Sequence, residues 1–401
     1  MIEDILTGFQ EALGIRELAV TAIRVEGQRV RIEAEVLMQR SCCPICGRIA
    51  HEIHQRIPRE LRHLPIFGKA CLLAYHEYQF LCPDCGQTWI GPLAFVDPYE
   101  THTKAYQEYL FDRVKASTIT TVAEEEGLPE KTLEHLHRRV AERRLQQRAV
   151  PLVRVLGIDE ISVKKGRQKY RAVLYDVEQG KVIELLEDRE KATVVAFLQK
   201  QSRQWLQAIQ VVTMDMWEGF YQAVREVLKG VPIVADKFHV VKQLNDRIND
   251  TRRAIQREAA EEVREQLKGC RWLLVKPAEK LTPDEQQKLD IALKASPELA
   301  QCYELKQEFL RIYEMKRIRR AKKRLRKWMA KVEAFGQRAL LAFVQTLRNW
   351  WEEVVAYFRH RVTNAAAEGL NTKIKLVLRR AFGFRNHESF RIRVLQACGD
   401  L

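Results

Sequence analysis

Hydrophobic and polar residues alternate along the first quarter of the chain. In residues 30–36, valine, isoleucine and alanine alternate with arginine and glutamate, which is the period-two pattern of a strand with one buried face. We expect such strands in residues 1 to about 100. Residues from about 103 to 148 are instead rich in helix formers, and a Gly-Leu-Pro sequence at 127–129 separates two helical stretches. The chain therefore begins with a β-rich part that is followed by a helical one.

The pattern changes again between about residues 152 and 245. Five apolar stretches there have the length of strands, and two stretches between them have helical spacing. The expected strands cover residues 152–158, 170–177, 181–186, 208–214 and 231–235, and the expected helices cover 191–204 and 219–228. The order β-β-β-α-β-α-β begins with hairpins and continues with crossover connections, which predicts a mixed sheet in an α/β domain. From about residue 240 to 358 the chain reads as almost entirely helical and highly charged.

Charge and length narrow the class of protein. The 401 residues suffice for two to four domains. The formal net charge of +15 favours a polyanionic partner such as nucleic acid, although a ribosomal-type or anionic-membrane binder would share it. The N-terminus lacks a basic segment followed by an apolar run, and no stretch approaches the ~18 apolar residues of a membrane span. We expect a cytoplasmic, nucleoid-associated protein with no membrane partner.

Six of the nine cysteines crowd the first quarter of the chain. In an intracellular protein such crowding indicates metal ligation rather than disulfides. Two Cys-x-x-Cys-Gly turns supply four thiolates, which predicts one structural Zn²⁺ in a closed site without an open catalytic position. The expected ligands are Cys43, Cys46, Cys82 and Cys85. Cys42 competes with Cys43 for the ion, and Cys71 lies in an apolar strand and is expected in the core.

Two aspartates follow apolar strands directly: Asp159 follows the first and Asp215 the fourth. If these strands are neighbours, the carboxylates converge, and keeping both ionised costs several kcal/mol unless a cation lies between them. Mg²⁺ or Mn²⁺ prefers such oxygen ligands, and two ions support an in-line phosphoryl transfer. An aspartate at a strand end is also a common helix cap. Other acids nearby are possible substitutes: Glu160, Asp176, Asp188 and Asp236. Asp236, at the end of the fifth strand, is the strongest of them, although we expect it to have a structural role beside His239.

A third acid lies far downstream, in a helix that we expect to begin after Asn364 as its N-cap and to run to Arg380. With 3.6 residues per turn, four polar residues fall close to one face. They are Glu368, Asn371, Lys375 and Arg379. A solvated helix face would show the same pattern. Gly369 argues against it, because glycine inside a helix costs about 1 kcal/mol and indicates close approach by another group.

Residues 120–133 have the pattern of a helix-turn-helix, with small Ala123 for close packing and Gly127 at the turn. Residues 130–144 would then form the recognition helix. The side chains expected to face DNA are Lys131, His135, Arg138 and Arg139. Three consecutive glutamates before the turn would repel phosphate unless they are turned away. A plain three-helix connector is the alternative.

A second basic segment runs from Lys316 to Lys331. Between these ends it carries Arg317, Arg319, Arg320, Lys322, Lys323, Arg324, Arg326 and Lys327. A charge run is usually a solvated helix face. This one is dense enough in cations to serve as a track for phosphates.

Several segments together resemble the DDE transposases, and specifically the ISL3 family of bacterial insertion-sequence transposases. The matching segments are Gly-Ile-Asp-Glu at 157–160, Met-Asp-Met-Trp at 214–217, Asp-Lys-Phe-His-Val at 236–240, Glu-Gly-Leu-Asn at 368–371 with Lys-Ile-Lys at 373–375, and Gly-Phe-Arg-Asn at 383–386. The resemblance covers essentially the whole chain. Matched position by position, it makes Asp159, Asp215 and Glu368 the catalytic, metal-binding acids and Lys375 a basic position common in DDE enzymes.

The resemblance also implies a domain plan and partners. It implies a multidomain α/β protein in which an RNase H-like catalytic core carries a large helical insertion. The parts would be a zinc-binding domain (1–100), a helix-turn-helix (101–150), the first part of the core (151–245), the insertion (246–358) and the end of the core with the Glu-bearing helix (359–401). It implies two catalytic Mg²⁺ or Mn²⁺ ions. Double-stranded DNA, both terminal inverted repeats and target, would be the partner of a homodimer or larger assembly.

These observations favour a DNA transposase that binds insertion-sequence ends and catalyses metal-dependent cleavage and strand transfer. The DNA-binding residues would be Lys131, Arg138, Arg139, Lys375 and Arg379. One alternative is an RNase H-like nuclease that cleaves without joining. The other is a non-catalytic regulator that uses the zinc module and the helix-turn-helix to bind DNA.

Overall fold

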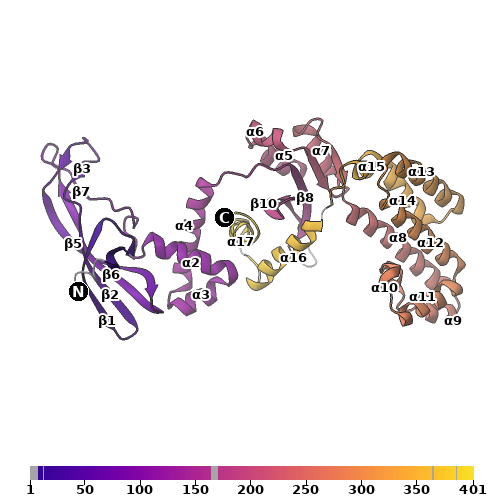
Figure 1. Ribbon diagram of the computed structural model, residues 1–401, viewed down its shortest axis with the longest axis horizontal. Helices are drawn as coiled ribbons and strands as arrows, with labels where there is room; N and C mark the ends of the chain where they lie inside the picture. The colour runs from indigo at the N-terminus through magenta and orange to yellow at the C-terminus, as the bar shows by residue number, and fades with distance from the viewer. Residues whose placement is uncertain (1–7, 12, 164–169, 364, 385) are drawn as a thin grey trace. The chain divides into compact units, whose positions relative to one another are not determined.

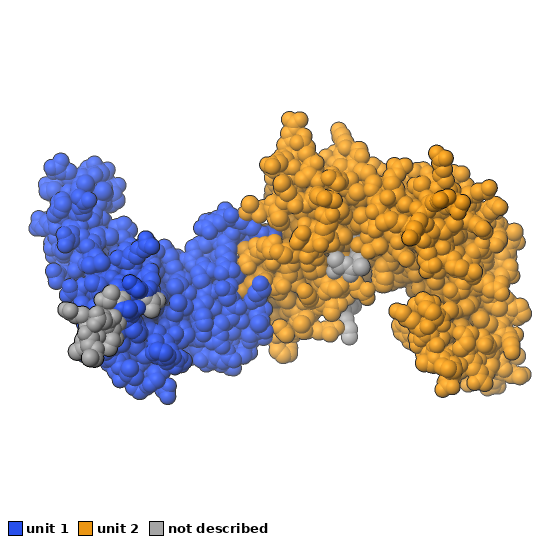
Figure 2. All heavy atoms as spheres, viewed as in Figure 1, with its two compact units in different colours: residues 1–148 blue, residues 149–401 orange. Residues whose placement is uncertain are grey.

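A computed structural model describes residues 8–11, 13–163, 170–363, 365–384 and 386–401. The chain divides into two compact units, residues 1–148 and 149–401, which Figure 2 colours separately. Among the described helices, none combines the length and the apolar composition that a bilayer span requires.

The first unit contains a five-stranded sheet in the order β1-β2-β6-β5, with β7 paired to β6 (Figure 1). Its strands are β1 (Leu18–Glu26), β2 (Arg29–Val36), β5 (Ile53–Ile66), β6 (Lys69–Leu81) and β7 (Thr88–Ile90). The alternation in residues 30–36 places the side chains of Val30, Ile32 and Val36 in the core. Cys71 is buried in β6, as expected. A small hairpin, β3 (Ser41–Cys42) and β4 (Ile49–Ala50), carries the first cysteine turn.

Three helices complete this unit: α2 (Lys104–Ala116), α3 (Ile119–Glu126) and α4 (Glu130–Gln147). Gly127 ends α3 with a left-handed φ of 64°, which glycine adopts without a steric penalty. Ala123 is buried where α3 meets its neighbours. The expected helix, turn and helix are therefore present at the expected residues.

The second unit is built on a mixed sheet in the order β10-β9-β8-β11-β12. Its strands are β8 (Val155–Ser162), β9 (Tyr170–Asp176), β10 (Lys181–Leu185), β11 (Val211–Met214) and β12 (Ile233–Ala235). β9 and β10 pair antiparallel, whereas β11 pairs parallel with both β8 and β12. The connecting helices are α5 (Lys191–Gln199), α6 (Arg203–Ala208) and α7 (Glu218–Val227). The predicted mixed sheet is thus confirmed, and the helix expected at 191–204 is divided into α5 and α6.

β8 extends further than the sequence suggested. Its parallel pairing with β11 ends at Ile158, opposite Met214, but its antiparallel pairing with β9 continues to Ser162. Asp159 therefore lies inside β8 rather than after it. It is the first residue beyond the parallel pairing, and so it still emerges beside Asp215.

The chain from residue 237 to 360 folds into a helical group with its own core. Its helices are α8 (Lys237–Glu258), α9 (Glu261–Gln266), α10 (Arg271–Val275), α11 (Pro283–Ala295), α12 (Pro297–Tyr313), α13 (Ile318–Phe335), α14 (Arg338–Asn349) and α15 (Trp351–His360), with a short 3-10 turn η1 (Ala278–Lys280). Phe309, Trp328 and Phe343 are fully buried there with ring centroids 4.9–6.0 Å apart. These aromatic contacts lie in a hydrophobic core that also includes Val211 of β11 and Val234 and Ala235 of β12.

The last two helices return to the sheet (Figure 1): α16 (Ala365–Arg380) packs against β8, and α17 (His387–Cys398) packs against β10 and α16. A bidentate ion pair holds α17 against β10. Arg391 donates through Nε and Nη2 to the two carboxylate oxygens of Glu184 in β10, both at 2.7 Å. Segments more than 200 residues apart in the sequence thus lie side by side at this sheet.

Candidate active site and zinc centre

Two carboxylates and an imidazole meet at the carboxyl edge of the parallel strands. One side-chain ligand atom from each of Asp159, Asp215 and His239 lies within 4.8 Å of the others. Asp159 is buried, with 5% of its surface exposed, and accepts a hydrogen bond from the backbone N–H of Glu160 at 2.7 Å. Asp215 follows β11 directly. The sequence-predicted convergence of the two acids is therefore present.

His239 lies in the first turn of α8 and bridges two acids. Its Nδ1 is 2.5 Å from Asp215 Oδ1 and 3.0 Å from Asp236 Oδ2. Asp236 is buried at the N-cap of α8, so it lies behind the imidazole. The expected pairing of Asp236 with His239 is present. In this arrangement Asp215, rather than Asp236, belongs to the cluster around Asp159.

Burial and mutual repulsion set the protonation of the cluster. Burial raises the pKa of Asp159, and burial together with the charge of Asp159 raises the pKa of Asp215 to about 6. Burial alone would lower the pKa of His239, but its hydrogen bonds to Asp215 and Asp236 outweigh this and raise it to about 10. His239 is therefore an imidazolium at neutral pH. Its positive charge meets part of the cluster's demand for a cation.

Asn371 of α16 closes the site from the C-terminal side, because its Nδ2 donates to Asp159 Oδ2 at 2.6 Å. Glu368 lies three residues earlier on the same helix, which is a neighbouring position on one face. Its side chain is exposed and is outside the cluster of Asp159, Asp215 and His239. Asn364, the expected N-cap of this helix, lies outside the described residues. The hydrogen bond from Asn371 was not foreseen, although its place on the face of Glu368 was.

The close approach expected at Gly369 does not come from the described chain itself. A Cβ built on this residue meets no heavy atom of the described chain within 4 Å. A close backbone contact is instead found at Gly157, where a Cβ would lie 2.2 Å from the ring of Tyr175 on β9. Glycine at 157 thus allows the buried Tyr175 ring to pack directly under the strand that carries Asp159.

The donor set fits a hard divalent cation. Asp159 and Asp215 offer carboxylate oxygens, and their raised pKa values show that the protein alone does not fully compensate their charge. Oxygen donors are the ligands that Mg²⁺ and Mn²⁺ prefer. The third member of the group is His239, whose Nδ1 lies against the Asp215 carboxylate.

The two cysteine turns of the first unit form a zinc site with four thiolate ligands. Their Sγ atoms lie within 4.8 Å of one another. The Cys43–Cys85 and Cys46–Cys82 pairs are 3.6 and 3.5 Å apart, close to the edge of roughly 3.8 Å of a tetrahedron with Zn–S bonds of about 2.3 Å. Cys42 is exposed and outside this group. The competition between Cys42 and Cys43 is therefore resolved in favour of Cys43.

The cations of α4 differ in their availability. Arg139 forms ion pairs with Asp97 and Glu100, and Arg138 lies 3.8 Å from Glu142. Lys131, like Lys375 and Arg379 on α16, is exposed. The structure therefore leaves Lys131 freer than Arg139 to meet a phosphate.

Two of the three glutamates before the turn, Glu125 and Glu126, are compensated inside the first unit. Glu126 accepts hydrogen bonds from the hydroxyl groups of Tyr106 and Tyr109 and pairs with Arg113, which also pairs with Glu125. Their charge is thereby largely neutralised.

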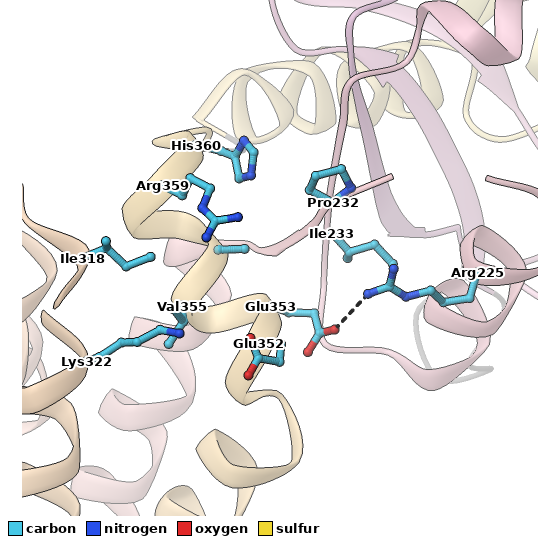
Figure 3. A pocket seen from close by; sticks show the side chains of 11 residues that line it. Arg225, Pro232, Ile233, Ile318, Lys322, Glu352, Glu353, Val355, Arg359 and His360 are labelled. Atoms are coloured by element: carbon cyan, nitrogen blue, oxygen red, sulfur yellow. Dashed lines mark ion pairs between the residues drawn. The ribbon is translucent and has the colours of Figure 1, made fainter. Parts of the chain in front are cut away.

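A separate cavity of about 240 Å³ lies at the other end of β12 (Figure 3). Pro232 and Ile233, at the start of that strand, line it, whereas Asp236 follows the strand's end. Figure 3 shows Glu353 beside Arg225, with 3.6 Å between the charged groups. The cavity is therefore distinct from the carboxylate cluster.

Comparisons with known proteins agree with these two sites. An ISL3-type transposase family model matches residues 156–394, and a model for the zinc finger of the IS204, IS1001, IS1096 and IS1165 transposases matches residues 39–85. The transposase for insertion sequence element IS1001 of Bordetella parapertussis is 26% identical over 358 residues, which is 88% of each chain. The transposase for insertion sequence element IS1557 of Mycobacterium tuberculosis is 25% identical over 389 residues, which cover 90% of this chain and 86% of the relative.

Paired carboxylates in a mixed sheet, preceded by a four-cysteine zinc ribbon, define a transposase of the DDE type. The family match covers more than half of the chain, and the chain belongs to the ISL3 family of transposases. The expected family, enzyme class and transposase function are thereby confirmed.

Proposed function

We propose that Asp159, Asp215 and Glu368 are the catalytic acids with which this transposase cleaves insertion-sequence ends and joins them to target DNA. The observation that carries this proposal is the hydrogen bond from Asn371 to Asp159. It anchors α16 at the acid pair, one helical turn from Glu368. Movement of the exposed Glu368 side chain toward this pair would then complete a three-carboxylate site.

These acids would hold two Mg²⁺ or Mn²⁺ ions, which when bound polarise the attacking hydroxyl and stabilise the leaving oxygen in an in-line displacement. The protein's own groups prepare the site. Asn371 fixes the orientation of Asp159, and His239, backed by Asp236, fixes that of Asp215. The carboxylates are thereby held in place before substrate binds.

The domain plan belongs to the same proposal. We place an RNase H-like core at 151–245 and 359–401, a helical insertion at 246–358, a helix-turn-helix at 101–150 and a zinc-binding domain at 1–100. The strand order of the second unit and the return of α16 and α17 to the sheet support this plan. The boundary between 245 and 246 falls inside α8, which runs from Lys237 to Glu258 as one helix, so this helix joins the core to the insertion. The partner would be double-stranded DNA, as terminal inverted repeats and target, bound by a homodimer or larger assembly on the cytoplasmic nucleoid.

The test is cleavage and joining with duplexes that carry the ends of the element. We expect Mg²⁺-dependent nicking at the end, followed by transfer of a pre-cut 3′-hydroxyl end into a plasmid. Nicking without joining would identify a nuclease. Binding without nicking would identify a regulator whose acids are structural.

The exposed face of α13 is the best-supported path for the DNA backbone. Ala321, Leu325 and Trp328 bury the opposite face. The cations on the exposed face make no ion pair with a described acid; they include Arg319, Arg320, Lys323, Arg324 and Lys327. The acid of this helix, Glu333, is already paired with Arg348. This face therefore carries uncompensated positive charge.

We expect replacement of Arg319, Lys323 and Lys327 by Gln to weaken binding to duplex DNA of any sequence. The slope of a plot of the logarithm of the DNA association constant against the logarithm of the salt concentration should become shallower by about 0.9 for each phosphate that the variant no longer neutralises. Titrations at several salt concentrations measure this slope. The matched control replaces Lys181, Arg247 and Lys268, which are paired with Asp400, Asp250 and Glu265. Equal slopes for the two triple variants would contradict the assignment.

The pKa of Asp215 predicts a pH dependence on the acid side. Because its pKa is raised to about 6, protons compete with the metal for this carboxylate at the acid edge of the physiological range. At limiting Mg²⁺, cleavage should fall as pH drops through about 6, and added Mg²⁺ should move the fall to lower pH. Initial rates between pH 5 and 8 at two Mg²⁺ concentrations measure this. A fall that added Mg²⁺ does not move would argue against the assignment.

A further inference from the structure

Two exposed aromatic rings stand at matching positions beside the carboxylate cluster. Trp217 lies two residues after Asp215, and Phe238 lies two residues after Asp236. The strands that precede them, β11 and β12, are parallel neighbours with Met214 opposite Ala235. Both rings therefore leave the same edge of the sheet, one strand apart. Trp217 is 39% exposed and Phe238 is 52% exposed.

Trp217 is held in place although it is partly exposed. The Arg189 guanidinium lies 4.3 Å from the Trp217 ring and 4.4 Å from the Tyr170 ring, so it is sandwiched between two aromatic faces. Arg189 also pairs with Glu160, the residue after Asp159. On the helix side, a Cβ on Gly219 would lie 2.7 Å from Trp217 Nε1. Glycine at 219 thus leaves the indole room against the start of α7.

Phe238 is tied to the cluster from the other side. Its ring stands edge-on to His239, with centroids 5.4 Å apart and planes at 87°, and His239 contacts Asp215. Single exposed apolar residues are common and need no explanation. Here two rings occupy equivalent places after adjacent strands, Trp217 at the N-cap of α7 and Phe238 in the first turn of α8, and each is two residues from an acid of the site. Neither belongs to the hydrophobic cores of the described chain.

Exposed rings at the rim of a phosphoryl-transfer site have a physical use. In a stacked duplex the base pairs hold the DNA backbone in a regular path, which limits how closely a phosphate can approach carboxylates at the edge of a sheet. Unstacking the neighbouring base lets the backbone bend toward these carboxylates. An aromatic ring offsets the lost stacking whatever the base, because every base presents a π-face. The Arg189 cation beside Trp217 would add to the attraction for the phosphate–base unit.

We infer that Trp217 and Phe238 form a stacking site for a nucleobase that leaves the duplex beside the cleaved phosphate. The inference rests on the proposed cleavage function and adds the conformation in which the end is bound. It predicts that the rate of cleavage depends on how easily the base pair at the cleavage point opens. It also predicts that cleavage requires an aromatic ring at these two positions, and that an aliphatic side chain cannot replace it.

The experiment compares cleavage of a matched end with that of an end carrying a mismatch at the base pair next to the cleaved phosphate. We expect Trp217→Leu and Phe238→Leu each to slow cleavage of the matched end by about tenfold, while Trp217→Phe and Phe238→Tyr stay near the wild-type rate. The mismatch should restore more activity to the leucine variants than it adds to the wild type. Trp272→Leu, at a 68% exposed tryptophan of α10, is the matched control and should cleave normally.

A second measurement needs no variant at either ring. With Asp159→Asn present to prevent cleavage, 2-aminopurine next to the cleaved phosphate should change its emission on binding, and the same probe ten base pairs inside should not. Normal cleavage by the leucine variants would overturn the inference, as would equal deficits on matched and mismatched ends or an unchanged probe. In those cases cleavage by the wild type would still support the proposed function. Absence of cleavage by the wild type would instead refute the proposed function itself.

Discussion

Asp159→Asn is expected to lower end cleavage by at least about a thousandfold while end binding stays intact. Asparagine has the shape of aspartate and can still bond to Asn371, but it removes one negative charge from the place where a divalent ion would bind. The folded protein should be no less stable than the wild type, because a buried carboxylate with a raised pKa is lost. Cleavage assays, DNA-binding titrations and thermal unfolding separate these effects.

The matched control for this variant is Asp176→Asn. Asp176 is also a buried aspartate of this sheet, but it ends β9 and accepts hydrogen bonds from the backbone N–H groups of Glu178 and Gln179 at a turn. We expect it to keep cleavage activity. Glu368→Gln should show the same loss as Asp159→Asn. Full cleavage by purified Asp159→Asn or Glu368→Gln would remove that residue from the catalytic set.

Loss of zinc is expected to have the second-largest effect. The second cysteine turn lies between the antiparallel strands β6 and β7. The zinc ion therefore fixes the turn at which the chain reverses direction after β6. Structural zinc contributes on the order of 10 kcal/mol to the folding of small modules. Cys82→Ser or a strong chelator should therefore unfold the tip of the first unit and abolish specific binding to the element's ends.

Metal analysis and limited proteolysis check this result. One zinc per chain is expected in the wild type and none in Cys82→Ser, with new cleavage sites near residues 40–90. Cys42→Ser is the control, because Cys42 is exposed and outside the four-thiolate group. Zinc retained by Cys43→Ser but lost from Cys42→Ser would reverse the ligand assignment.

Regular patterns predicted most of the fold. Period-two alternation located the strands, and the glycine at 127 located the turn between α3 and α4, because both depend on local backbone physics. The extension of β8 past Asp159 could not be predicted in the same way. It depends on β9 continuing its pairing to Tyr170 after β11 has ended, which is a tertiary property.

In the candidate site, too, features set by local sequence could be predicted and features set by tertiary packing could not. Strand order made the meeting of Asp159 and Asp215 predictable, and helical spacing placed Asn371 on the face of Glu368. The hydrogen bond from Asn371 depends on the docking of α16, which local sequence does not encode. Arg139 looked available for DNA because its partners, Asp97 and Glu100, are some forty residues earlier in the chain. The expectation of a close approach at Gly369 stays a prediction, because the space beside this glycine is open in the described chain.

The ion pair between Glu184 and Arg391 fastens the end of the second unit to a strand made some two hundred residues earlier. During synthesis, the ribosome therefore releases the zinc module and the sheet strands long before α16 can reach Asp159. A nascent or prematurely terminated chain would hold DNA-binding parts without a finished cutting centre. The carboxylate site is therefore the last part of the second unit to be completed.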